Sequence, residues 1–167
     1  MKKILLATVL FVGVAVSSFA QSKDGKFSVG VEAGLPVGNA KNAYNFVIGG
    51  SLKYDLPIAT STNFTISAGY SSFLGKTVST PVGNIKYAAA GFIPVKAGIK
   101  YFFAPEFYGE AQLGAAFGTQ SGWGTAFAYS PGIGYKFSDV VDLGVRYEAW
   151  AYNGTVSQIA ARLGFSF

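Results

Sequence analysis

The chain has 167 residues, enough for one domain, of which half are hydrophobic and only 13% are charged; water-soluble domains usually carry about 25% charge. It contains neither Cys nor His, which excludes disulfides, Ser-His-Asp and Cys-His catalysis, and the usual zinc sites. We therefore expect no enzyme, no cofactor and no metal. The formal net charge of +5 comes from basic residues spread along the chain, so nucleic acid is not an expected partner.

The first twenty residues are typical of an export signal. Lys2 and Lys3 form a basic region, an apolar stretch follows, and Ser18-Phe19-Ala20 has the small-x-small pattern that precedes cleavage. We predict a cleavable signal peptide over residues 1–20 and a mature domain over residues 21–167. The alternative is a retained anchor, although the apolar stretch is short for a membrane span.

After the signal, hydrophobic side chains recur with a period of two, which is typical of β-strands. In the final run, Ile159, Leu163 and Phe167 share one face, whereas Gln158 and Arg162 lie on the other. No apolar run here approaches the roughly 20 residues of a membrane helix. The pattern predicts eight antiparallel strands over these runs: 27–35, 46–54, 64–70, 85–103, 107–117, 127–137, 143–151 and 159–167.

The apolar face carries aromatic residues at one common level, which favours a membrane barrel over a soluble one. An interfacial girdle of aromatic side chains marks the edge of the membrane in such barrels. Seven of the eight strands supply a member at the same end, and the strand that begins at Leu143 does not. The predicted girdle is Phe27, Tyr54, Phe64, Phe103, Phe107, Phe137 and Phe167.

The connections differ in length between the two ends, as in membrane barrels with short periplasmic turns and longer outer loops. The segments 104–106 and 138–142 are short, and 55–63 is somewhat longer. The segments at the other end are rich in Gly, Asn, Ser and Thr: 36–45, 74–84, 118–126 and 152–157. Both termini then lie at the short-turn end, which we expect to face the periplasm.

The polar face predicts a lumen filled by charged side chains, since eight strands enclose just enough room for side chains. Turn spacing places Lys100 opposite Glu110 and Lys136 opposite Asp142, as cross-strand ion pairs. A network that joins Glu32, Arg162, Glu148 and Arg146 is also expected. The predicted lumen residues, structural or pore-lining, are Glu32, Lys53, Lys96, Lys100, Glu110, Lys136, Arg146, Glu148 and Arg162.

Two prolines and two tryptophans need separate interpretation. A missing N–H breaks a strand ladder, so we expect a β-bulge at Pro131 and a strand that projects above the membrane at Pro94. Trp150 faces inward near the outer end and is interpreted as a lumen plug, and Trp123 as loop packing. Contact with a ligand is the alternative for both residues.

The chain resembles the small eight-stranded outer-membrane β-barrel family of the OmpX and OmpA-barrel type, a porin-like outer-membrane barrel domain. The signal ending Ser18-Phe19-Ala20-Gln21, the repeated Gly-aromatic alternation of residues 132–137 and the terminal Arg162-Leu163-Gly164-Phe165-Ser166-Phe167 carry the resemblance. It implies an all-β, up-and-down transmembrane barrel in the outer membrane, inserted by the outer-membrane assembly machinery and surrounded by outer-membrane lipid. Because no sequence follows Phe167, a peptidoglycan-binding module is not expected.

Three hypotheses for function remain open at this stage. The first is a non-enzymatic envelope protein with a filled polar lumen, which acts in envelope integrity or binds a surface ligand through its outer loops. The second is a narrow passive pore with a slight anion preference, because the predicted lumen has six basic and three acidic residues. The third is a soluble calycin-like ligand carrier.

Overall fold

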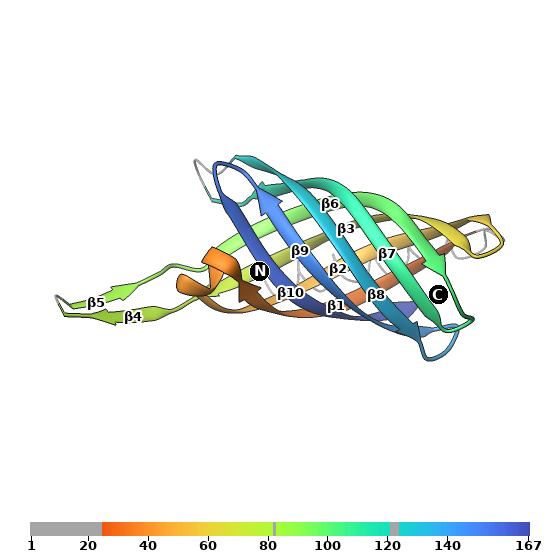
Figure 1. Cartoon of the computed structure of the whole chain (residues 1–167), viewed down its shortest axis with the longest axis horizontal. Coiled ribbons are helices and arrows are strands. Elements are labelled where there is room, and N and C mark those ends of the chain that lie inside the picture. The colour runs from red at the N-terminus through yellow and green to blue at the C-terminus, as the bar shows by residue number, and fades with distance from the viewer. Residues whose placement is uncertain (1–24, 82, 121–123) are drawn as a thin grey trace, which may run out of the picture.

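The computed structural model describes residues 25–81, 83–120 and 124–167. The predicted signal peptide, its cleavage site and Trp123 lie outside the described residues. The described part is almost entirely β-structure, and it has the shape of a slanted barrel with one long projection (Figure 1). No helix within it is long and apolar enough to cross a membrane.

Within the described residues, eight antiparallel strands close into a barrel in the order β1-β10-β9-β8-β7-β6-β3-β2. Every barrel strand pairs with its neighbours in the chain, and β1 pairs with β10 to close the seam, so the up-and-down prediction is confirmed. The barrel strands are β1 (Lys26–Val37), β2 (Tyr44–Ala59), β3 (Thr62–Gly75), β6 (Ala90–Phe102), β7 (Phe107–Gly118), β8 (Thr125–Lys136), β9 (Val141–Ala151) and β10 (Thr155–Ser166).

The two ends of the barrel differ strongly. The short-turn end has the connections 60–61, 103–106 and 137–140 and both ends of the described barrel. The hairpin end has the 3-10 helix η1 (Gly38–Asn42), the segment 76–89, and the connections 119–124 and 152–154. In the segment 76–89, strands β4 (Thr77–Thr80) and β5 (Gly83–Lys86) form a separate hairpin that extends well beyond the barrel rim (Figure 1).

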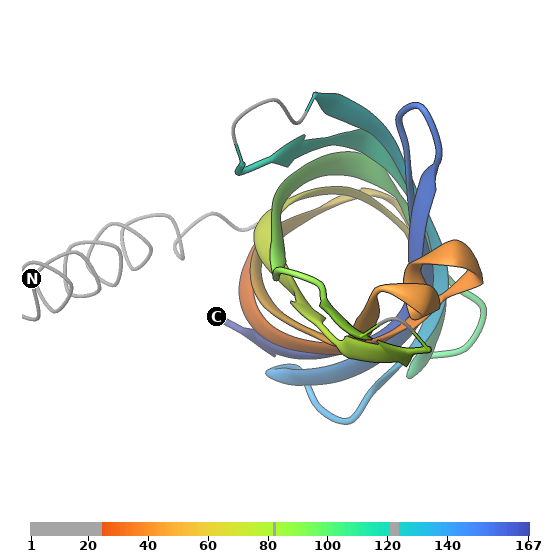
Figure 2. The ribbon, with the colours of Figure 1, turned by 90° about the vertical axis from the view of Figure 1, so that its left-hand side faces the viewer.

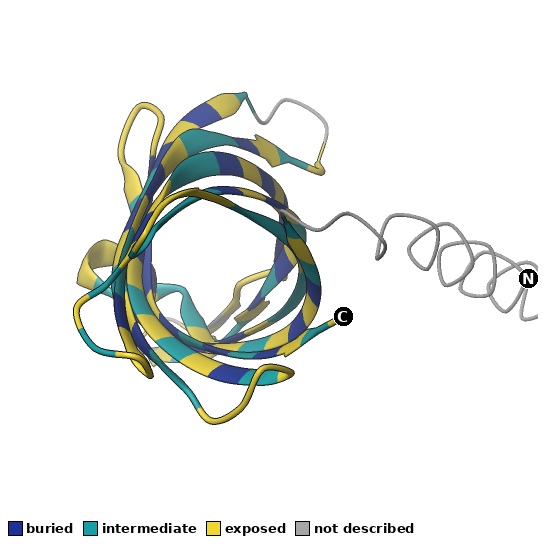
Figure 3. Ribbon diagram, turned by 90° about the vertical axis from the view of Figure 1, so that its right-hand side faces the viewer, coloured by how far each residue is buried: buried dark blue, intermediate teal, exposed yellow. Residues whose placement is uncertain are grey.

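The barrel is apolar outside and polar inside, the inverse of a soluble barrel. Val31 and Ile133 point outward and are 62% and 65% exposed, whereas Lys53, Lys96 and Arg162 are buried. Buried and exposed residues therefore alternate along each strand (Figure 3). This pattern follows from the period of two in the sequence, because successive strand residues point to opposite faces.

Two predicted boundaries are wrong. The run 85–103 is not one strand: β6 begins at Ala90, and Ile85 belongs to the hairpin outside the barrel. The predicted connection 55–63 is mostly strand, because β2 and β3 stay paired up to a turn at 60–61. Whether residues 55–59 and 85–89 belong to the barrel wall depends on pairing with a neighbouring strand, which is not a local property.

The predicted consequences of the two strand prolines are also wrong. The pairs on either side of Pro131 keep one register between β8 and β9, so no extra residue forms a bulge there. Pro94 lies in the barrel wall opposite Ala116, not in a projecting segment. Instead, two successive residue pairs are missing from one ladder at each proline. They are missing between β3 and β6 at Pro94 and between β8 and β9 at Pro131, while the register on either side stays the same. The register shifts of the barrel occur on β2, one of them beside Pro57.

Candidate functional site: the filled lumen and the hairpin end

A cluster of aromatic rings fills the lumen toward the hairpin end. Phe73, Phe92 and Trp150, here called the plug, are 0%, 5% and 2% exposed. Their ring centroids lie 4.6 Å apart for Phe92–Trp150, 5.3 Å for Phe73–Trp150 and 5.9 Å for Phe73–Phe92. Buried alanines on β6, β7 and β8 make room for the rings, among them Ala90, Ala116 and Ala128. The three rings contact one another across this end of the described lumen.

Only one member of the plug was predicted from its sequence position. Trp150 faces inward, as its strand position predicts. Phe73 and Phe92 were missed, although a signal was present: each has the strand parity of the polar face, where an aromatic ring must fill the lumen. All three rings come from different strands, β3, β6 and β9, which meet only when the barrel closes.

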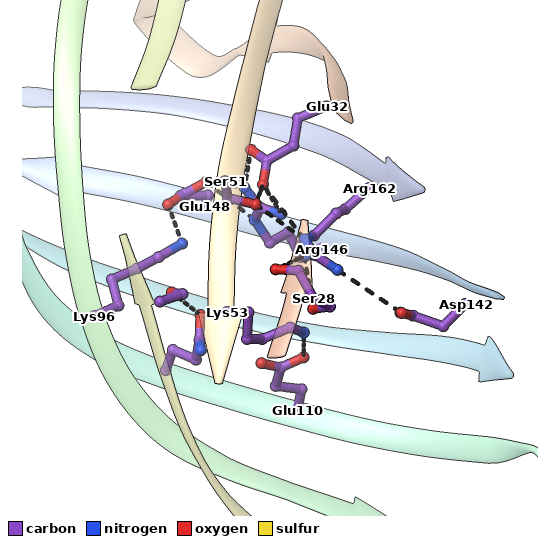
Figure 4. Close-up of polar contacts among 12 residues, drawn as sticks. Ser28, Glu32, Ser51, Lys53, Lys96, Glu110, Asp142, Arg146, Glu148 and Arg162 are labelled. Carbon is purple, nitrogen blue, oxygen red and sulfur yellow. Dashed lines mark hydrogen bonds and ion pairs between the residues drawn. The ribbon is translucent and has the colours of Figure 1, made fainter. Parts of the chain in front are cut away.

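Below the plug lies the upper network, a set of buried ion pairs centred on Glu148 (Figure 4). Arg146 Nη2 donates to Glu148 Oε2 at 2.9 Å and to Glu32 Oε2 at 2.6 Å. Lys96 Nζ donates to the other oxygen of Glu148. The carboxylate of Glu148 is fully buried, so the two cations offset the large cost of removing it from water.

Arg162 connects the upper network to the lower half of the lumen. It lies opposite Glu32 in the register of β1 and β10, as predicted. Its guanidinium donates to Ser51 Oγ at 2.9 Å and to Ser28 Oγ at 3.0 Å, and lies 3.9 Å from Glu32 and 3.8 Å from Asp142. The structure thus brings the four residues of the predicted network together, with Arg146 as the direct bridge between the two glutamates.

The lower network pairs residues that are not neighbours on adjacent strands. Lys100 lies opposite Glu110 in register, yet its ammonium binds Asp55. Glu110 Oε2 instead accepts a hydrogen bond from Lys53 Nζ at 2.8 Å. The predicted register of Lys100 with Glu110 is therefore confirmed, but the predicted ion pair between them is wrong. In a narrow barrel, long side chains reach across the lumen to strands two or three places away.

The predicted pair of Lys136 and Asp142 fails in the same way. The two residues are register partners. Lys136 turns toward the exposed turn residue Asp139, with a contact of 2.6 Å. Asp142 accepts a hydrogen bond from Tyr108 Oη at 2.6 Å and lies beside Arg162. Tyr108 and Asp55 were both missed as lumen residues in the sequence.

The lumen of the described barrel is balanced in charge. Five basic and five acidic side chains form the networks inside it, because Asp55 and Asp142 face inward and Lys136, at the short-turn mouth, pairs with the exposed Asp139. The expected ratio of six to three is therefore wrong, and with it the basis for an anion preference. The ten residues are Lys53, Lys96, Lys100, Arg146, Arg162, Glu32, Asp55, Glu110, Asp142 and Glu148.

The remaining space inside the barrel is divided. A cavity of about 40 Å³ lies between the two networks, beside Ser130 and Gln112, and has room for a few water molecules. A larger hollow of about 350 Å³ opens at the short-turn end between Lys26, Asn63 and Phe102. The described residues contain no cluster of three or more acidic groups placed to hold a metal ion.

The residues of the predicted girdle gather at the short-turn end of the outer face. Phe27 and Tyr54 are register partners with ring centroids 4.5 Å apart, and Phe103 lies 6.2 Å from Phe107. The amide of Phe167 donates to the carbonyl of Phe27 at 2.9 Å across the seam. Their position agrees with an interfacial ring, and their contact with the membrane interface stays a prediction.

A closed eight-stranded barrel with an apolar outer face and a charged, filled lumen defines a small integral β-barrel membrane protein. The profile of the outer membrane protein beta-barrel domain matches residues 6–167, so the chain belongs to this outer-membrane family. A search of curated protein sequences finds no match to this chain.

Solved structures show the same fold at low sequence identity. Ail, the attachment invasion locus protein of Yersinia pestis, is 16% identical with a TM-score of 0.61, over 87% of this chain and all of that one. A second Ail structure, in complex with the heparin analogue sucrose octasulfate, is 18% identical with a TM-score of 0.60, over 86% of this chain and 99% of Ail. The N-terminal barrel domain of Pseudomonas aeruginosa OprF is 15% identical with a TM-score of 0.51, over 84% and 97%.

Proposed function

We propose that this chain is a non-enzymatic outer-membrane barrel that acts through the surface of its hairpin end, with both termini in the periplasm. The observation that carries the proposal is the filled lumen together with the long hairpin. The plug and the two networks occupy the interior, and every lumen carboxylate has a charged or hydroxyl partner. The interior thus serves stability, and the surface beyond the rim is the part available to a partner.

The hairpin β4–β5 supports this proposal because it contributes nothing to the barrel wall. It pairs only within itself, in the register of Thr77 with Lys86 and Thr80 with Gly83. Its outer edges offer backbone donors and acceptors that an extended partner segment can bind. An isolated hairpin is marginal in stability, so a projection of this length is expected to have a use. Ail, which has this fold, has been solved in complex with the heparin analogue sucrose octasulfate, so a barrel of this fold can bind a polyanion.

The two other hypotheses have less support. The outward apolar face and the membership of an outer-membrane family do not fit a soluble calycin-like carrier. A passive pore requires a continuous water path, whereas Phe73 and Trp150 are buried against each other across the lumen. Recording from planar bilayers tests this point: the folded chain should give no discrete conductance. Reproducible single-channel steps would revive the pore.

The surface role is tested by replacing residues 77–86 with a four-residue Gly-Ser turn in the full-length chain. Cells that carry the variant should lose adhesion to host matrix and to heparin-coated surfaces, while extracted protein keeps the heat-modifiable gel mobility of a folded barrel. Ser130→Ala, inside the lumen, is the matched control and should retain adhesion. Equal adhesion with and without the hairpin would contradict the proposal.

A further inference from the structure

The net charge of the described barrel lies entirely at its hairpin end. The lumen holds five cations and five carboxylates. The short-turn end adds Lys26 and Lys136 against Glu106 and Asp139. The connections at the hairpin end contain no Asp or Glu in the sequence, and they contain three lysines: Lys41, Lys76 and Lys86. These three, here called the lysine cluster, make up the whole net charge of +3 of residues 25–167.

The backbone holds the three lysines on adjacent segments. The amide of Lys76 donates to Ala43 O at 3.0 Å, which ties it to the η1 connection, and its carbonyl accepts from Tyr87 N at 3.0 Å, next to Lys86. Lys76 Nζ also donates to Lys41 O at 2.6 Å, at the last turn of η1. The helix and the base of the hairpin thus lie side by side over one sector of the rim (Figure 2). Within the described residues, no carboxylate pairs with this cluster.

The cluster lies just beyond the apolar surface of β1, β2 and β3. Near the hairpin end these strands carry the exposed apolar side chains of Leu35, Phe46 and Leu74. Lys76 follows Leu74 by two residues, which at about 3.3 Å per residue and a tilt of about 40° is roughly 5 Å along the membrane normal. The headgroup layer is about 5–7 Å thick on each side. Lys76 therefore lies at headgroup depth, and Lys41 and Lys86 lie on the segments bonded to it or next to it. The half-exposed Tyr87 beside it is a residue type common at this level.

From this placement we propose that Lys41, Lys76 and Lys86 form a binding site for the phosphate groups of an anionic lipid headgroup in the surrounding leaflet. Ammonium groups are strong ligands of phosphate, and three of them without a carboxylate give a local positive potential. A lipid fits better than a soluble polyanion because the cluster lies at the base of the hairpin, beside the lipid-facing strands, and not at its tip. The lipid site rests on the proposed function in one respect: that function places the hairpin end, and so this leaflet, on the outer side of the membrane.

The test measures binding of diphosphorylated lipid A, and of phosphatidylcholine as the zwitterionic comparison, to the purified full mature chain in detergent by native mass spectrometry. The wild type should bind lipid A more tightly than phosphatidylcholine, and added salt should weaken only lipid A binding. Each lysine replaced by Gln should weaken lipid A binding about fivefold. The triple variant K41Q/K76Q/K86Q should lose nearly all preference, and the corresponding triple Arg variant should keep it.

Controls separate the site from general charge. K26Q/K136Q removes the same kind of charge at the opposite end and should leave lipid A binding unchanged. If Lys76→Gln disturbs folding through its bond to η1, the double variant K41Q/K86Q, at two exposed positions, carries the test. Unchanged lipid A binding in these variants would overturn the proposal. So would loss of sucrose octasulfate binding with lipid A binding intact, which would assign the cluster to a soluble polyanion. Neither result depends on cell adhesion, so the hairpin experiment is judged separately.

Discussion

Replacing Glu148 with Gln tests whether the upper network stabilises the barrel. Its carboxylate is fully buried and accepts hydrogen bonds from Lys96, from Arg146 at 2.9 and 3.0 Å, and from Trp150 and Gln158 at 3.4 and 3.3 Å. Gln keeps the shape, but it removes the charge and directs an amide donor at other donors. Removing one partner of a buried ion pair typically costs 3–5 kcal/mol. We expect a loss of about 3–5 kcal/mol in the free energy of unfolding.

The measurement is denaturant unfolding of the barrel in phospholipid vesicles, followed by tryptophan fluorescence. A second variant, E148Q/K96M, removes the uncompensated cation as well and should recover at least half of the loss, since replacing both members of a buried pair is often close to neutral. Glu106→Gln, in an exposed turn, is the control and should change stability by less than about 0.5 kcal/mol. A cost below about 1 kcal/mol for E148Q, or strictly additive losses in the double variant, would refute the reasoning.

Three further predictions concern packing and titration. Gly98→Ala should cost about 1–3 kcal/mol in the same unfolding assay, because the new Cβ would overlap a carbonyl oxygen of β7. Gly50→Ala is the control and should be tolerated, because the nearest atom to its new Cβ lies at 3.5 Å. Equal costs for the two variants would contradict the overlap. Trp150→Ala should cost about 3–5 kcal/mol by emptying the plug, and a near-neutral result would mean that the plug collapses or is dispensable. The hydrogen bond from Lys136 lowers the pKa of Asp139, so Lys136→Met should raise that pKa in an NMR titration. The contact between the two side chains is kept at neutral pH and is lost as the pH falls through the lowered pKa. An unchanged pKa in the variant would disprove the pairing.

The strand pattern was predictable because it is local. Alternation alone assigned Val31 to the outside and Lys96 to the inside, since a strand residue cannot change face without shifting register. Turn spacing likewise predicted the register of Lys100 with Glu110 and of Lys136 with Asp142. Tight turns transmit register from one strand to the next, so these pairings follow from the chain without knowledge of the barrel's interior.

The ion pairs themselves were not predictable, because they join strands that the sequence does not connect. Lys53 on β2 meets Glu110 on β7, and Lys96 on β6 meets Glu148 on β9, in each case three strands away around the barrel. Such contacts depend on the diameter and shear of the closed barrel. The same closure brings the three plug rings together. Asp55 was missed for another reason: β2 continues past Tyr54, which places Asp55 on the inward face.

The sequence by itself determined the membrane barrel: the number of strands, the face each side chain takes and the pairing of neighbours. These properties follow from a period of two and from short turns, which act over a few residues. Only the tertiary structure decided which charges neutralise one another, how the lumen is plugged, and that residues 77–86 leave the wall to form a hairpin. Those outcomes depend on side chains from distant strands competing for one narrow interior, so they exist only after the seam between β1 and β10 has closed.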